Sequence, residues 1–123
     1  LSGQSAGSGA LQMKARVNGV CQAAVANSDL QRAGGTHRYN ARLNERCNLA
    51  GGYYVVMKHP VGLLDAAAQV EGRQISLSPD STETIIAESD LAGIRDRDLS
   101  VIYRPTSDEI TFSIELRPKK AVR

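Results

Sequence analysis

Residues 11–25 read LQMKARVNGVCQAAV, and every second position in this stretch holds an apolar or small side chain. Successive side chains of a β-strand point to opposite faces, so this period of two predicts a half-buried strand over residues 11–26. Asn18-Gly19 in its middle leaves a bulge or a turn as alternatives, and residues 20–26 alone also fit a helix. The inward series consists of Leu11, Met13, Ala15, Val17, Gly19, Cys21, Ala23 and Val25.

The two cysteines both lie on the apolar phase of an alternating segment. Cys21 belongs to the series above, and Cys47 ends a second predicted strand over residues 37–47. Two cysteines allow one connectivity, and their inward positions on two strands predict a Cys21–Cys47 disulfide. The alternative is two buried free thiols in a reducing compartment. A persistent disulfide is typical of the periplasm, the cell surface or the extracellular space.

The strand over residues 37–47 contains one residue that breaks its apolar phase. Tyr39, Ala41 and Leu43 share the phase of Cys47, whereas Glu45 places a charge on it. Charged side chains are almost never fully buried unless they are paired, so we expect Glu45 near an edge of its sheet.

The rest of the chain alternates short apolar segments with turn residues. Residues 27–36 and 90–98 are expected to be loops, and residues 63–70 are expected to be a helical turn or a strand. About seven strands without a long amphipathic helix predict an all-β fold, a sandwich of two antiparallel sheets. The last two strands are expected to form a hairpin around residues 105–108. Further strands are expected at residues 53–58, 74–77, 82–87, 99–103 and 110–116.

The length of 123 residues corresponds to a single domain. Residues 1–10 are rich in Gly and Ser, which predicts a flexible linker or frayed N-terminus. Residues 11–118 are expected to form the β-sandwich domain, and residues 119–123 are expected to form a basic tail.

Aromatic residues make up only 4% of the chain, which predicts an aliphatic core and argues against nucleic-acid binding. No segment is apolar enough for a membrane span. No charged-then-apolar leader opens the sequence, so export would require a signal peptide that has already been removed.

The sequence contains no motif of an enzyme, a cofactor site or a metal site. It lacks a Gly-x-Ser-x-Gly elbow, and the expected disulfide would remove both thiols as nucleophiles. His37 and His59 have no ligand-like neighbours and are interpreted as surface residues. The acidic residues from Glu88 to Asp98 favour a solvated loop over a calcium site. Tyr53-Tyr54 is interpreted as a pair of half-buried strand residues rather than a sugar platform.

Three local segments carry a family resemblance. Residues 17–21 read VNGVC, residues 43–48 read LNERCN, and residues 51–56 follow at once with GGYYVV. Together with the closing alternating strand over residues 110–116, they resemble pilin-type subunits of bacterial chaperone–usher systems, especially the spore coat protein U-like branch. The resemblance implies an incomplete immunoglobulin-like sandwich that interacts with a neighbouring subunit or chaperone by β-strand addition.

The resemblance also implies a location for the partner strand. The groove would lie between the first and last strands, lined by Leu11, Met13, Ala15, Val17, Ile110, Phe112, Ile114 and Leu116. The expected function is that of a non-enzymatic structural or adhesive subunit of an exported, pilus-like cell-surface assembly. The alternative is a monomeric periplasmic binding module whose loops recognise a small ligand, a glycan or a protein.

Overall fold

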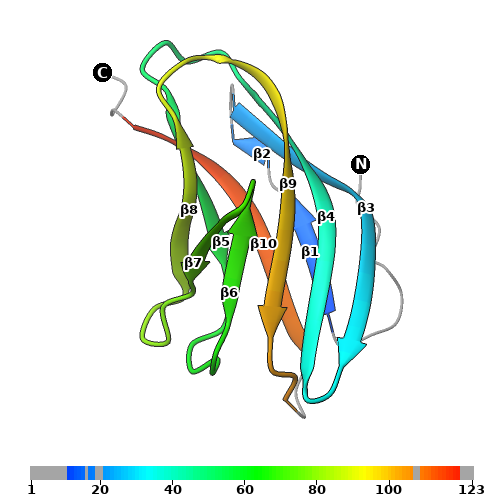
Figure 1. Cartoon of the computed structure of the whole chain (residues 1–123). Helices are drawn as coiled ribbons and strands as arrows, with labels where there is room; N and C mark the ends of the chain where they lie inside the picture. Colours follow the sequence, from blue (N-terminus) through cyan, green and yellow to red (C-terminus); the bar gives the residue numbers. More distant parts are fainter. Residues whose placement is uncertain (1–10, 16, 19–20, 107–108, 120–123) are drawn as a thin grey trace.

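A computed structural model describes residues 11–15, 17–18, 21–106 and 109–119. In this part of the chain all regular structure is β-strand, arranged as two sheets packed face to face (Figure 1). The strands are β1 (Leu11–Ala15), β2 (Val17–Asn18), β3 (Cys21–Ala33), β4 (Thr36–Cys47), β5 (Tyr53–Lys58), β6 (Ala67–Val70), β7 (Arg73–Ser76), β8 (Glu83–Ser89), β9 (Gly93–Tyr103) and β10 (Ile110–Pro118). The predicted all-β sandwich is confirmed.

The strand order resembles that of immunoglobulin domains. The four-stranded sheet has the order β1-β10-β5-β8, and the six-stranded sheet has the order β2-β3-β4-β9-β6-β7. The runs β3-β4-β9-β6 and β5-β10 match strands A-B-E-D and C-F of the constant-type sandwich, in which strand G lies at the edge beside F. In this chain β1 occupies that edge position. Its pairing with β10 is parallel, whereas all the other strand pairs are antiparallel.

The core lies between the two sheets and is mainly aliphatic, as the composition predicts. Tyr103 and Phe112 pack edge-on within it, with their ring centroids 5.6 Å apart. Cys21 and Cys47 are directly opposite each other on β3 and β4, and the predicted disulfide between them is confirmed. Fully buried side chains from both sheets include Leu43, Val55, Met57, Leu99, Val101, Ile114 and Leu116.

The single strand expected over residues 11–26 is wrong, and the alternative of a turn at Asn18-Gly19 fits the structure better. The structure divides this stretch into β1 in the four-stranded sheet and β2 and β3 in the six-stranded sheet. β2 and β3 are antiparallel, since Val17 pairs with Gln22 and Asn18 with Cys21. The three strands share one sequence phase, so an alternation pattern alone could not show where one ends and the next begins.

Two segments expected to be loops belong mostly to strands, although residues 34–35 and 90–92 remain outside them. β3 continues to Ala33 through a register shift between Ala26 and Asp29, and it turns into β4 at Gly34-Gly35. Gly34 has a φ of 63°, a left-handed conformation that glycine adopts without strain. Residues 93–98 are the first part of β9, where polar side chains line the outer face of the six-stranded sheet. A polar sequence therefore concealed regular strand structure at both places.

The hairpin expected between residues 99–103 and 110–116 is also wrong. β9 belongs to the six-stranded sheet and β10 to the four-stranded sheet, so the chain crosses between the layers after Tyr103. Lys119, which the sequence places in a basic tail, lies against the sandwich. Its Nζ is 2.7 Å from a carboxylate oxygen of Glu88 and 5.3 Å from the ring centroid of Tyr54. Residues 1–10 and 120–123 lie outside the described residues.

Candidate functional site

The first candidate site is the edge of the four-stranded sheet, where β1 pairs with β10. Leu11 lies opposite Ile110, Met13 opposite Phe112, and Ala15 opposite Ile114. The β10 side chains in these pairs are between 0 and 2% exposed. Within the described residues, β1 pairs with β10 alone. A strand of five residues is therefore held in the sheet by a single ladder.

This arrangement brings together most, but not all, of the residues expected to line the groove. Because β1 pairs directly with β10, no third strand fits between them. Val17 lies in β2, in the other sheet, where it pairs with Gln22. Leu116 lies on β10 beyond the reach of β1, which ends opposite Ile114, and it pairs with Val55. A partner strand would consequently have to take the place of β1 rather than lie beside it.

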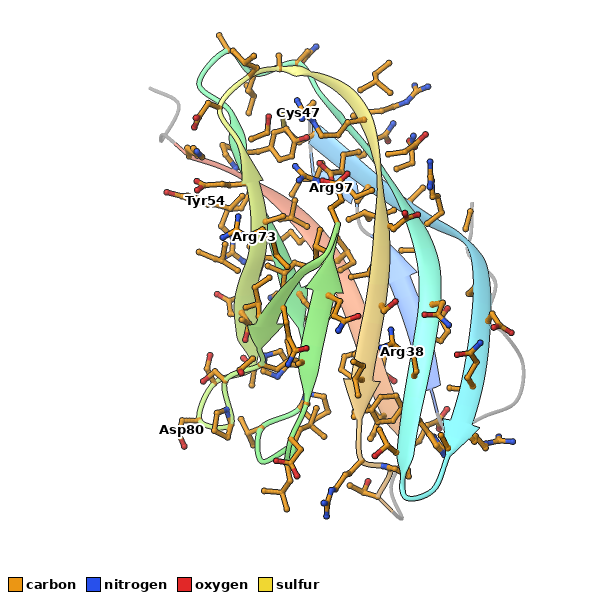
Figure 2. The ribbon with its side chains drawn as sticks, in the orientation of Figure 1. Arg38, Cys47, Tyr54, Arg73, Asp80 and Arg97 are labelled. Atoms are coloured by element: carbon orange, nitrogen blue, oxygen red, sulfur yellow. A yellow bond between two sulfur atoms is a disulfide. The ribbon has the colours of Figure 1, made fainter. Side chains whose placement is uncertain are left out.

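The second candidate site is a buried polar cluster that the sequence analysis missed. Glu45 is fully buried on the central strand β4, so its expected position near an edge is wrong. The Tyr53 hydroxyl donates a hydrogen bond of 2.6 Å to Oε1 of Glu45. Nε of Arg97, whose side chain extends from β9 (Figure 2), donates one of 2.6 Å to Oε2. Since Tyr53 is on β5, the cluster connects the two sheets.

The electrostatics of this cluster favour a fixed, fully bonded arrangement. A further nitrogen of Arg97 donates to the Glu88 carbonyl oxygen at 3.2 Å, and the Glu71 carboxylate lies 3.6 Å from the guanidinium. Burial raises the pKa of Tyr53, and the hydrogen bond to Glu45 raises it further. The phenol therefore stays protonated and remains a donor. Both carboxylate oxygens of Glu45 are occupied, which fits a structural link between the sheets better than an acid–base role.

The sequence contains one signal for this cluster, two opposite charges that each lie on the apolar phase of a strand. Arg97 shares the inward phase of Leu99 and Val101, as Glu45 shares the phase of Leu43 and Cys47. Opposite charges on the apolar phases of two separate strands indicate a buried ion pair when the two strands are neighbours. The sequence did not show that β4 and β9 are adjacent.

The outer face of the four-stranded sheet carries an ion-pair network. Arg117 of β10 makes two hydrogen bonds to Glu83 of β8, at 2.9 and 3.1 Å. This contact crosses the intervening strand β5 diagonally, because Arg117 is in register with Tyr54 and Glu83 with Lys58. Val56 lies between Tyr54 and Lys58 on β5 and is only 1% exposed. The network thus covers an apolar side chain on the outer face.

We expect Glu83→Gln to destabilise the domain near neutral pH only. The Arg117 guanidinium beside Glu83 holds the pKa of that carboxyl below its ordinary value of 4.5. A lowered pKa in the folded state contributes stability above that ordinary value, and the contribution is lost as the pH falls through the folded pKa. For a partly exposed pair the expected cost is about 0.5–1 kcal/mol. Urea unfolding should show this difference at about pH 7 and its disappearance at about pH 3. An equal deficit at both pH values would contradict the ion-pair explanation.

One of the two histidines is buried, although both were expected at the surface. His59, interpreted from the sequence as a surface residue, is 5% exposed, with Nε2 2.7 Å from the Thr84 hydroxyl oxygen. His37 packs edge-on against Tyr103 with ring centroids 5.5 Å apart. Among the described residues, no group of three or more His, Cys, Asp or Glu side chains is placed to hold a metal ion.

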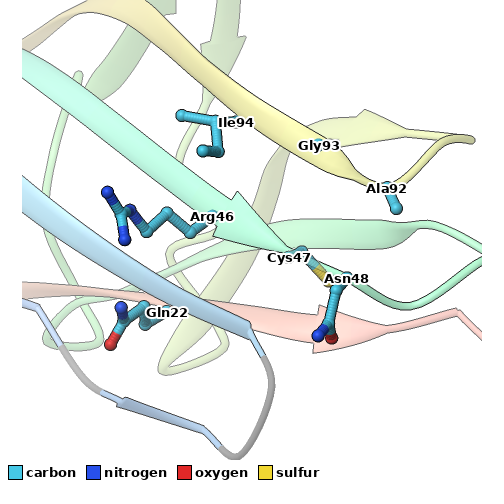
Figure 3. A pocket seen from close by; sticks show the side chains of 7 residues that line it. All are labelled: Gln22, Arg46, Cys47, Asn48, Ala92, Gly93 and Ile94. Carbon is cyan, nitrogen blue, oxygen red and sulfur yellow. The ribbon is translucent and has the colours of Figure 1, made fainter.

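A third candidate site is a hollow on the six-stranded sheet. Its volume is about 520 Å³, and it lies where β4 ends and β9 begins (Figure 3). Cys47 of the disulfide contributes to its wall. Among the described residues, its lining consists of Gln22, Arg46, Cys47, Asn48, Ala92, Gly93 and Ile94.

The fold and the disulfide define the chain as a disulfide-bonded β-sandwich domain. No protein-family model matches it, and neither the curated proteins nor the solved structures include a significant match. In the part of the chain that the structure describes, no helix is long and apolar enough to cross a membrane. The geometry of the three candidate sites is therefore what indicates a function.

Proposed function

We propose that the chain is a non-enzymatic structural subunit of an exported, pilus-like cell-surface assembly, whose copies join by β-strand addition. The observation that carries this proposal is the place of β1. An immunoglobulin-like sandwich has a strand beside F, and here that edge of β10 is filled by a strand that precedes the body of the sandwich in sequence. The same segment of a neighbouring copy, or a strand of a chaperone, could fill it equally.

The energetics of the edge support an exchange between copies. Ile110, Phe112 and Ile114 are buried in the core at the positions where β1 pairs with β10. Without β1 the backbone edge of β10 beside these core residues would be unpaired, an arrangement that favours pairing with another chain. A β1 segment from a second copy would offer the same residues in the same register. The contacts between β1 and β10 would be the same with or without the exchange. Any difference in free energy therefore comes from how the copies are arranged in the assembly.

The disulfide supports the exported location in this proposal. Cross-strand disulfides persist in the periplasm, on the cell surface and outside the cell, and they are rare where thiols are kept reduced. A subunit of a surface assembly would work in such a compartment. An adhesive role in the same assembly is compatible with the geometry of the strand edge.

Cysteine cross-linking between chains can test the proposal. Gln12 and Thr111 are register partners across β1 and β10. A Gln12→Cys chain mixed with a Thr111→Cys chain at high concentration is expected to give a covalent dimer through these two positions, identified by mass spectrometry of tryptic fragments. A mixture of Lys14→Cys with Thr111→Cys is the matched control, because Lys14 pairs with Ser113 and is out of register with Thr111.

The double variant Gln12→Cys/Thr111→Cys separates pairing within a chain from pairing between chains. If the double variant cross-links only within itself, and the mixed single variants stay monomeric after unfolding and refolding together, β1 belongs to its own sandwich. The assembly proposal would then fail, and the monomeric binding module would be favoured.

A further inference from the structure

The outer face of the six-stranded sheet carries a ladder of paired polar side chains. The outward residues of β4 alternate between arginine and asparagine, and most of them contact a polar partner on β9 or β6. Asp98 accepts a hydrogen bond from Arg42 at 2.6 Å, and Asp96 accepts one from Asn44 at 2.7 Å. The remaining contacts of the ladder are Ser100 to Asn40 at 2.7 Å and Arg38 to Gln69 at 3.1 Å.

The ladder ends at Arg46. Its register neighbours are Gln22 on β3 and Ile94 on β9, neither of which carries a charge. Figure 3 shows Arg46 between these two side chains. Where the pattern of β9 would place another acceptor, it places Ile94, which is 68% exposed. Arg38 reaches Gln69 on β6 and Arg42 reaches Asp98 on β9, so among the described residues Arg46 is the one arginine of the β4 ladder that donates to no side-chain acceptor.

The hollow beside Arg46 is open to solvent rather than enclosed. Its volume of about 520 Å³ leaves room for a short peptide segment lying on the surface of the sheet. The side-chain amides of Gln22 and Asn48 line it and offer both hydrogen-bond donors and acceptors. Ala92 and Gly93 are small, which leaves the backbone at the start of β9 accessible.

We propose that this hollow binds a peptide carboxylate that is flanked by an apolar side chain. The planar guanidinium of Arg46 matches a carboxylate in a bidentate geometry. Ile94 provides the apolar contact, and the amides of Gln22 and Asn48 match the donor and acceptor of a peptide group. The described residues of the lining include no aromatic side chain, the flat surface on which a sugar ring would pack. The site involves neither β1 nor β10 and is independent of the proposed assembly.

The test is a titration of the ¹⁵N-labelled full chain with the peptide acetyl-Leu-Asp-amide, followed by NMR. We expect saturable shifts at the Gly93 backbone amide and at the side-chain amides of Gln22 and Asn48. Arg46→Gln should weaken binding by about tenfold or more, the effect of losing one charge-assisted contact. Arg42→Gln is the matched control on the same strand and face. It should leave the affinity unchanged, because Asp98 occupies Arg42.

Three further probes decide the chemistry of the ligand. Acetyl-Leu-Asn-amide removes the charge and acetyl-Gly-Asp-amide removes the apolar side chain, and both should bind more weakly than the parent peptide. Glucuronate offers a carboxylate on a sugar and should not saturate the site. The proposal is overturned by an absence of saturable shifts, by glucuronate binding as tightly as the peptide, or by equal losses in the two arginine variants.

Discussion

Arg97→Met is expected to destabilise the domain by about 3–5 kcal/mol, the typical cost of removing one partner of a buried ion pair. The Glu45 carboxylate is fully buried and accepts its hydrogen bonds from Arg97 and Tyr53. Without the guanidinium, a charge would remain between the sheets with a single neutral donor. Single domains are stable by only about 5–15 kcal/mol, so the loss should be large enough to measure by guanidinium-induced unfolding.

Two control variants separate the ion pair from simple loss of side-chain volume. Arg95 lies on the same strand and the same inward phase and is the register partner of Glu45, but its Nε has no hydrogen-bond partner. Arg95→Met should therefore cost much less than Arg97→Met. The double variant Arg97→Met/Glu45→Leu removes both charges and should recover most of the lost stability, because apolar residues can replace a buried pair without penalty.

The same measurements can contradict the explanation. If Arg97→Met costs less than about 1 kcal/mol, the value of an exposed pair, Glu45 must exchange its partner for water in the folded state. If the double variant is less stable than Arg97→Met alone, the apolar substitution does not fit between β4 and β5, and packing rather than charge decides the outcome.

The sequence predicted the strands better than it predicted their neighbours. Alternation located β4, β5 and β10 to within a few residues, and the inward phases of Cys21 and Cys47 predicted the disulfide. The period of two reports which face of a strand is buried, but it does not report which sheet the strand joins. For that reason the sequence merged β1, β2 and β3 into one strand and paired β9 with β10.

The candidate sites show the same limit, since they depend on contacts between distant parts of the chain. Glu45 and Arg97 are separated by 52 positions, so the residues around Glu45 did not indicate a buried partner. A position near a sheet edge was therefore expected for this charge. Arg46 differs from Arg42 only by what β9 places opposite it, which is Ile94 instead of Asp98. At neither place could a residue reveal its partner without knowledge of which strands are neighbours. The information was in strand pairing, which the folded structure alone provides.

Replacing both cysteines, as Cys21→Ala/Cys47→Ala, should cost about 3–4 kcal/mol, which the loop-entropy estimate gives for a closed loop of this length. The bridge joins positions separated by 26 residues and lies at the open end of the β3–β4 hairpin, opposite the turn at Gly34-Gly35. It therefore restricts the unfolded chain and fixes the hairpin register at the end where the turn has least influence. Reversible unfolding in guanidinium, compared between the two chains under oxidising conditions, measures the difference.

Reduction of the natural chain provides the matched control for this variant. Adding dithiothreitol should lower the stability of the natural chain to that of the double variant and leave the double variant unchanged. Alanine lacks the sulfur of a reduced cysteine, so the double variant also loses a little packing at these buried positions. Agreement between the two reduced samples to within about 1 kcal/mol would assign most of the loss to the cross-link. If reduction leaves the natural chain as stable as before, the hairpin is held by β4–β9 and β3–β4 pairing alone. The argument from the disulfide to an oxidising compartment would then lose its energetic basis.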